Sequence, residues 1–261
     1  MKNTLVTVPC YNEAQRLKLP LFAEFAAAND VAFLFVNDGS TDETGSLLDA
    51  AVAAAPTGDL HVLHLAQNAG KAEAVRRGML WTLENTDAAF LGFWDADLAT
   101  PLGDINNFVE KLRGEDGEAG ERGEGGERGG SYEIVTGLRL ARLGCKVERR
   151  RLRHYLGRFF ATCVSEMLRV PVYDSQCGAK LFKRALIGAL FGEPFATRWF
   201  FDVEVLARYI DLVGVSQTKA CVCEYPLHEW TDVGGSRLKL TDFFKAPWEL
   251  LKIARRRRHR K

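Results

Sequence analysis

The sequence predicts an α/β fold, a mostly parallel sheet with helices on both faces. Short apolar runs, such as VAFLFV at 31–36, alternate with stretches of helical spacing through the first hundred residues. The runs are apolar throughout, which is typical of strands that are buried on both faces. Polar, acidic or glycine-bearing turns follow them, and in a parallel sheet such turns meet at the carboxyl edge, where ligands bind.

The first half of the chain is expected to supply the parallel strands. They are predicted at Leu5–Val8, Val31–Val36, Leu60–Leu65 and Ala88–Trp94. Helices are predicted at Ala14–Ala28, at 40–55 and at Lys71–Glu84. The second of them would open on a capping box, in which Ser40 is followed three residues later by Glu43.

The second half is expected to complete one domain that spans residues 1–240. Residues 114–131, GEDGEAGERGEGGERGGS, have Ala119 as their one apolar side chain and predict a flexible loop. Strands are expected at Tyr132–Val135 and Lys219–Tyr225, with a short strand or turn at Cys177–Phe182. Cys221 and Cys223 would then face the same side. Helices are expected at Arg149–Leu168 and Phe201–Val213, and a basic amphipathic segment at 241–261.

Composition excludes several classes of protein. With 47% hydrophobic residues and a net charge of +1, the chain has ordinary globular composition and no overall basic field. Only the tail KIARRRRHRK is strongly basic, so we expect no nucleic-acid partner. The six cysteines form no CxxC pair, which indicates reduced thiols rather than a zinc site. The opening MKNTLVTVPCYNE lacks the apolar core of a signal peptide, and no run of about 18 apolar residues exists. A cytoplasmic location is therefore expected.

Asp95 and Asp97 are the strongest candidates for chemistry. They flank Ala96 directly after an apolar strand, and side chains two residues apart in an extended chain point the same way. Paired carboxylates suit a hard cation, either Mg²⁺ or Mn²⁺. Such a cation would neutralise a diphosphate leaving group.

The other three turns carry residues that suit a nucleotide. Asp38, within NDGSTD, could accept a hydrogen bond from a base N–H, and Gly39 permits close backbone approach. Tyr11 could pack beside the base, while Glu13 could bond to the base or the ribose. Lys71, at a helix start after Asn68-Ala69-Gly70, suits a phosphate.

Taken in order, these motifs resemble the family 2 glycosyltransferases of the GT-A fold. The resemblance is carried in the first half by PCYNE, NDGSTD, NAGKAEAVRRG and DADLATP. In the second half DSQCGAKLFK, FDVEVL, EWTD and GSRL are similar to dolichyl-phosphate β-glucosyltransferases and, more loosely, to dolichol-phosphate mannose synthases. Mannose synthases usually carry glutamine where this chain has Ala99, so this position favours the glucosyltransferase branch.

The resemblance implies a role for each matching position. It implies a nucleoside site at Pro9, Tyr11, Glu13 and Asp38, a donor contact at Lys71, metal–diphosphate ligands at Asp95 and Asp97, and a diphosphate contact at Arg237. Arg139, Gln176 and Lys180 would face the donor sugar or the acceptor phosphate, and Asp202 and Glu204 would lie near the acceptor. The family inverts the anomeric centre by direct displacement.

The acceptor stays open at this point. A polyprenyl phosphate is favoured, with a UDP-glucose-like donor; it is already anionic and needs little base assistance. A hydroxyl on a soluble or glycan acceptor would need a carboxylate base, either Asp174 or Asp202. A nucleotide-sugar binding protein without turnover is the alternative of another class, and a dinucleotide oxidoreductase is disfavoured because no GxGxxG follows the first strand. Peripheral contact of the 241–261 segment with an anionic membrane, on its inner surface, is a further expectation.

Overall fold

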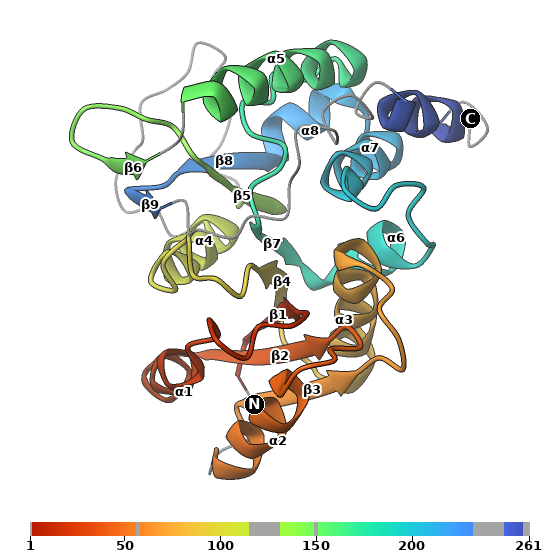
Figure 1. Cartoon of the computed structure of the whole chain (residues 1–261). Helices are drawn as coiled ribbons and strands as arrows, with labels where there is room; N and C mark the ends of the chain where they lie inside the picture. Colours follow the sequence, from red (N-terminus) through yellow and green to blue (C-terminus); the bar gives the residue numbers. More distant parts are fainter. Residues whose placement is uncertain (1, 56–57, 115–130, 149–150, 232–247, 258–261) are drawn as a thin grey trace.

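The computed structural model describes residues 2–55, 58–114, 131–148, 151–231 and 248–257 (Figure 1). Its strands are β1 (Thr4–Cys10), β2 (Val31–Asn37), β3 (Leu60–His64), β4 (Phe90–Trp94), β5 (Ile134–Leu138), β6 (Lys146–Glu148), β7 (Ala179–Lys183), β8 (Val222–Pro226) and β9 (Glu229–Thr231). Its helices are α1 (Leu19–Ala28), α2 (Thr44–Ala54), α3 (Lys71–Asn85), α4 (Asp104–Arg113), α5 (Arg151–Leu168), the 3₁₀ turn η1 (Arg184–Leu186), α6 (Ile187–Phe191), α7 (Phe201–Val213) and α8 (Val215–Cys221). Residues 248–257 form one more helix.

Within the described residues the main sheet has seven strands, in the order β3-β2-β1-β4-β7-β5-β8. β1 pairs in parallel with β2 and with β4, β2 pairs in parallel with β3, and β5 pairs in parallel with β8. β7 runs antiparallel to both of its neighbours, β4 and β5. The predicted α/β fold with a mostly parallel sheet is confirmed, and the reversed β7 is an addition to it.

The reversal of β7 brings the second half of the chain to the carboxyl edge of the sheet. Trp94, the last residue of β4, pairs with Ala179, the first residue of β7. A strand that runs antiparallel to its neighbours starts where they end. Residues 174–178 therefore lie beside the turn that begins at Asp95, and Arg139 leaves β5 at the same edge.

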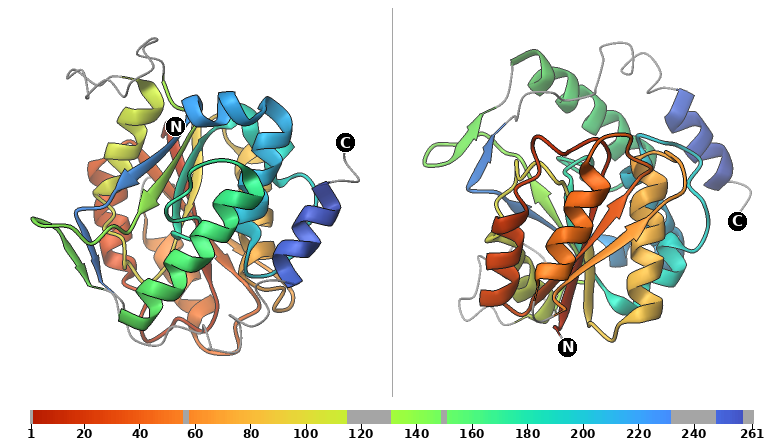
Figure 2. Two further views of the ribbon diagram at one scale, coloured as in Figure 1. Left: turned by 90° about the horizontal axis from the view of Figure 1, so that it is seen from above. Right: turned by 60° about the horizontal axis from the view of Figure 1, so that its bottom comes forward.

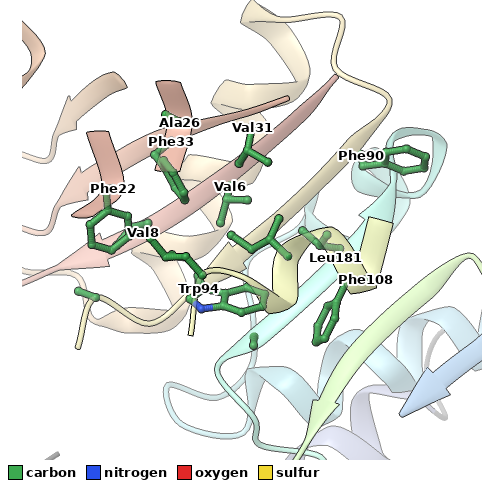
Figure 3. Packing of buried hydrophobic residues seen from close by; sticks show 14 of the residues in the cluster. Val6, Val8, Phe22, Ala26, Val31, Phe33, Phe90, Trp94, Phe108 and Leu181 are labelled. Atoms are coloured by element: carbon green, nitrogen blue, oxygen red, sulfur yellow. The ribbon is translucent and has the colours of Figure 1, made fainter. Parts of the chain in front are cut away.

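The two faces of the sheet are covered by different helices, as Figures 1 and 2 show. On one face α1, α2 and α4 pack on a cluster that includes Phe33 and Phe35 of β2. Figure 3 shows part of it, with Phe22 meeting Phe33 edge to face at 5.1 Å between ring centroids. On the other face α3, α6 and α7 pack on a cluster that includes Leu34 and Val36 of β2. Alternate residues of one strand thus enter opposite cores, which is why the run is apolar throughout.

Three expected boundaries are wrong. The first helix begins at Leu19 rather than Ala14, because residues 14–18 form turns and a proline occupies its first turn. The second begins at Thr44, without a capping box, because the Ser40 hydroxyl accepts a hydrogen bond from the Asn12 N–H instead. Cys221 ends α8 and only Cys223 lies in β8, so the two cysteines do not share a strand.

The described part of the C-terminal segment packs on the domain. Ile253, 2% exposed, belongs to a third cluster with Phe160 of α5 and Val203 of α7. Trp248 and Leu251 remain 68% and 40% exposed. The described residues do not include the rest of the predicted amphipathic segment or Arg237. They include only the two ends of the predicted 114–131 loop. None of the described helices combines the length and the hydropathy that crossing a membrane requires.

Candidate active site

The loops that follow β1 and β2 are tied to each other at the carboxyl edge. The Asn12 N–H donates to Ser40 Oγ (3.0 Å), and the Thr41 N–H donates to Asn12 Oδ1 (2.8 Å). Asn12 has a φ of 51°, a left-handed conformation that asparagine adopts more readily than most residues. Pro9, near the end of β1, and Tyr11, in the loop that follows, are predicted to hold a nucleoside and are both half-buried.

Glu13 lies in the same loop, near the acidic centre. Its carboxylate accepts from Arg16 Nε (3.0 Å) and Arg16 Nη2 (2.7 Å). Its negative charge contributes to a raised pKa of Asp97, so the two carboxylates are close enough to interact. The predicted ribose or base contact of Glu13 is compatible with this position and stays a prediction.

Asp38 fixes the loop that leads into α3. Its carboxylate accepts from the Ala69 N–H and the Gly70 N–H, both at 2.8 Å, and from Asn68 Nδ2 at 3.1 Å. Asp38 is 3% exposed. Gly39 beside it has a φ of 62°, and a Cβ there would stand 2.5 Å from the Asn68 backbone nitrogen. The loop therefore needs both residues, and the contact of Asp38 with a base stays a prediction.

Lys71, at the start of α3, faces the carboxylates that follow β4. Its ammonium pairs with Asp95 Oδ1 at 2.5 Å. Burial alone would lower the pKa of Lys71, but the charges of Asp95, Asp202 and Asp97 together raise it. The Lys71 ammonium thus lies near three carboxylates, two that follow β4 (Asp95 and Asp97) and one in α7 (Asp202).

Asp95 and Asp97 form an acidic pair at the end of β4. Burial raises the pKa of Asp97, and the charge of Asp95 raises it further, while the Ala99 N–H donates to Asp97 Oδ1 at 3.0 Å. A cation placed between the two carboxylates would favour the charged form of Asp97, which burial and the neighbouring charge disfavour. Within the described residues no third His, Cys, Asp or Glu completes a ligand cluster with them.

The Asp95 carboxylate is confined between the Lys71 ammonium and the backbone at Gly178. A Cβ on Gly178 would stand 1.8 Å from Asp95 Oδ2, so the bare backbone of the 174–178 loop lies against this carboxylate. Hard cations prefer oxygen ligands, and Mg²⁺ in particular keeps waters and binds one or two carboxylates plus substrate phosphates. Asp95 and Asp97 therefore fit the predicted role in holding Mg²⁺ or Mn²⁺ together with a diphosphate.

Lys180 and Asp202 make a buried ion pair beside this centre. Lys180 Nζ lies 2.7 Å from Asp202 Oδ1 and donates to the Cys177 carbonyl at 2.6 Å. Both side chains are 7% exposed. Asp202 also contributes to the raised pKa of Lys71, so it faces both lysines. The predicted site residues Lys71, Asp95, Asp97, Lys180 and Asp202 are thus brought together.

Arg139 and Asp174 form a second ion pair at this edge. Arg139 Nε and Nη2 each donate to Asp174 at 2.7 Å, and the Arg139 N–H adds a bond of 3.2 Å. Glu224 of β8 accepts from the Tyr173 and Asp174 N–H groups and holds the turn. A carboxylate engaged at both oxygens by a guanidinium is poorly placed to take a proton. Arg139 thus engages both oxygens of Asp174, whereas Lys180 engages one oxygen of Asp202; the role of either carboxylate as a base stays a prediction.

Glu204 does not face this centre. Its carboxylate accepts from the Ala196 N–H at 2.7 Å and from Arg208 Nη2 at 2.9 Å, and its side chain is 4% exposed. These bonds anchor the 193–197 loop to α7. The expectation that Glu204 acts beside Asp202 is corrected accordingly, since the helix turns it to another side.

Gln176 is half-buried in the loop between Asp174 and β7, at the expected edge. Sequence reasoning missed three neighbours of the site: Gly178, Glu224 and Arg198. The exposed Arg198 side chain lies 3.9 Å from the Cβ position of Gly70. An acidic residue inside an apolar strand is the signal that could have indicated Glu224.

The protein is of the α/β class with a cluster of acidic and basic side chains at the carboxyl edge of its sheet, and comparison with known proteins gives the family. The profile of glycosyl transferase family 2 matches residues 5–175, and the chain belongs to this family. It is 32% identical to the dolichyl-phosphate beta-glucosyltransferase of Drosophila melanogaster, over 96% of this chain and 72% of that one. It is 30% identical to the protein of the same name from Dictyostelium discoideum, over 89% of this chain and 68% of that one.

Solved structures confirm the fold. Glucosyl-3-phosphoglycerate synthase from Mycobacterium tuberculosis, in complex with Mn²⁺, uridine diphosphate and glucosyl-3-phosphoglycerate, matches with a TM-score of 0.63 and 20% identity. The match covers 98% of this chain and 80% of that one. The GT-A fold and the assignment as a family 2 glycosyltransferase are thereby confirmed.

Proposed function

We propose that the enzyme transfers glucose from UDP-glucose to the phosphate of a polyprenyl phosphate, with inversion at the anomeric carbon and with Mg²⁺ or Mn²⁺ as cofactor. One observation carries the proposal: Asp95, Asp97, Lys71, Lys180 and Asp202 converge at the carboxyl edge of the sheet. The relatives named as dolichyl-phosphate beta-glucosyltransferases support the donor sugar and the acceptor class.

One set of residues is assigned to the donor nucleotide and its diphosphate. Asp95 and Asp97 hold the cation, which when bound supplies positive charge for the departing diphosphate. The 10–14 and 38–44 loops and the Asp38-fixed 68–70 loop shape the nucleotide side. Lys71 holds Asp95 in place and adds positive charge near the phosphates.

The acceptor side is formed by the paired cations. Arg139 and Lys180 stand on the β5 and β7 side of the centre, each oriented by a carboxylate. A phosphate acceptor is an anionic nucleophile already, so these cations position it and no proton has to be removed. For a hydroxyl acceptor, Asp202 is the carboxylate in position to take the proton.

We also propose a cytoplasmic enzyme that meets the membrane surface through residues 248–257. Trp248 and Leu251 are exposed there, which suits an interfacial helix. Arg257 pairs with Asp211 at 2.5 Å and Arg256 with Glu193 at 3.5 Å, so part of the basic run holds the helix to the domain. Flotation with anionic liposomes tests this contact: Trp248→Ser with Leu251→Ser should lower recovery, and unchanged recovery would rule out these side chains.

A labelled-donor assay tests the proposed function. Purified protein with Mn²⁺ or Mg²⁺ and a polyprenyl phosphate is given UDP-glucose, other UDP-sugars or GDP-mannose in turn. Label from UDP-glucose should enter the organic phase and should be lost with Asp97→Asn. Label that stays aqueous, despite donor binding measured by calorimetry, would point to a hydroxyl acceptor. Donor binding with no turnover on any acceptor would indicate a nucleotide-sugar binding protein.

A further inference from the structure

A cavity of about 210 Å³ lies behind the ion pair of Lys180 and Asp202. Its walls come from β5, β7, β8, α7, α8 and the 170–175 segment. Most of the lining is apolar, including Ile134, Val172, Val205, Leu206 and Val222. An apolar cavity of about 150 Å³ is enough to hold a benzene molecule. This one therefore has room for a small branched hydrocarbon group.

One end of the cavity is polar and belongs to the active site. Lys180, Asp202, Asp174 and Glu224 line it. The Glu224 carboxylate is engaged by the Tyr173 and Asp174 N–H groups and Asp174 by Arg139, which leaves Lys180 as the cation that faces the acceptor in the proposed reaction. Thr136 lines it too: the residue is 7% exposed, and within the described residues its hydroxyl has no hydrogen-bond partner. The cavity therefore suits a ligand with oxygen at one end and hydrocarbon at the other.

A second hollow lies beside the 170–172 wall of the cavity. This more open hollow of about 620 Å³ shares Val170, Pro171, Val172 and Lys219 with the cavity. It runs along α5 past Arg158 and Arg169. Within the described residues only the 170–172 segment and Lys219 separate the two spaces, and the outer one is lined by Arg158 and Arg169 as well as Glu166.

We propose that this cavity receives the first isoprene units of the acceptor, whose phosphate lies at the Lys180 end and whose remaining chain leaves along α5. The inference rests on the proposed function and extends it by placing the lipid. A phosphate next to Lys180, carried by a five-carbon branched unit, matches both the polar end and the apolar walls. The cavity would then select a prenyl phosphate over a free phosphorylated metabolite, which has no apolar group to fill it.

A pair of tryptophan substitutions on one helix tests the placement. Leu206→Trp fills the cavity from α7, while Leu212→Trp, on the same helix at a position that is 55% exposed, is the matched control. The KM for citronellyl phosphate should rise about tenfold or more with Leu206→Trp, because a filled hydrophobic pocket excludes its ligand. The Kd for UDP-glucose, by calorimetry, should stay unchanged in both variants.

The outcomes separate the two proposals. Wild-type enzyme that transfers to citronellyl phosphate, with equal KM for the two variants, would overturn the cavity assignment and leave the proposed function standing. Wild-type enzyme that neither binds nor glycosylates any prenyl phosphate would overturn both. If Leu206→Trp fails to fold, a diazirine-bearing prenyl phosphate gives the answer in wild-type protein. Crosslinks should map to Val172, Leu206 or Val222, and crosslinks confined to other segments would refute the placement.

Discussion

Replacing Gly178 with alanine should separate metal binding from folding. The new Cβ would stand 1.8 Å from Asp95 Oδ2, whereas real Cβ contacts are essentially never shorter than 3.0 Å. The Asp95 carboxylate must therefore retreat by about 1.2 Å, which is more than half of a metal–oxygen bond of about 2.1 Å. Because the atom in the way is the end of a side chain, the fold can absorb the change.

We expect Gly178→Ala to lower kcat/KM about 100-fold, the usual consequence of misplacing a reacting group by about 1 Å. Mn²⁺ affinity, measured by calorimetry or by electron paramagnetic resonance on the free enzyme, should fall with it, while the melting temperature should change little. Gly103→Ala is the control, since nothing lies within 4 Å of its Cβ position. Wild-type Mn²⁺ affinity in Gly178→Ala would refute the reasoning that this backbone positions Asp95.

Four further outcomes follow from the site. In metal-free protein at neutral pH, Asp97→Asn should raise the melting temperature in differential scanning fluorimetry. Burial and the charge of Asp95 raise the pKa of Asp97, so the folded protein favours the protonated carboxyl. The stability that this carboxyl contributes is therefore full below the ordinary carboxyl pKa and declines as the pH rises through the raised pKa. A melting temperature of Asp97→Asn below that of the wild type would contradict this. Lys71→Met should tighten Mn²⁺ binding to the free enzyme, because it removes the ammonium paired with Asp95, and lower kcat about tenfold or more; weaker Mn²⁺ binding would show that Lys71 does not compete with the cation. Asp202→Asn should reduce turnover and, because it leaves Lys180 buried without its partner, should also lower the free energy of unfolding. Glu204→Gln should lower the free energy of unfolding by ~3 kcal/mol, measured by urea denaturation, because it weakens the buried pair with Arg208, and should leave the turnover of the folded enzyme unchanged; lost turnover in Glu204→Gln with normal turnover in Asp202→Asn would exchange their assigned roles. Burial raises the pKa of Cys177 to about 11, so iodoacetamide should leave this thiol unmodified in native protein at pH 8, and rapid labelling would show that the 174–178 loop opens.

The parts of the fold that sequence could predict are those that depend on local pattern. The apolar run at Val31–Val36 has its side chains divided between two cores, so it could be recognised without any knowledge of its partners. Asp95 and Asp97 could be singled out because they follow such a strand. The direction of a strand within the sheet cannot be predicted in this way. The residue pattern of Ala179–Lys183 is the same whether this strand is parallel or antiparallel to its neighbours. Its reversal, and with it the position of Gly178, depends on pairing across the sheet.

The errors at single residues have the same cause. Ser40 had the spacing of a helix cap, but a loop 28 residues earlier in the sequence uses its hydroxyl. Glu204 stands two residues from Asp202, and two residues in an α-helix correspond to a rotation of about 200°. The side chain therefore meets Arg208 rather than the centre. Asp174 could be identified as important, but its bidentate pairing with Arg139 depends on a contact between residues 35 positions apart.

The reversed strand β7 also links the proposed metal site to complete folding of the sheet. Asp95 comes from the first parallel unit, while the backbone that confines it, at Gly178, arrives only when β7 pairs with β4. A nascent chain that has folded its first four strands would hold both aspartates and still lack one wall of their site. Contacts between such distant segments form late, because loop closure must precede them. Divalent-cation affinity would therefore appear together with the last cooperative step of folding, and an incomplete chain would not sequester the cation or bind its donor prematurely.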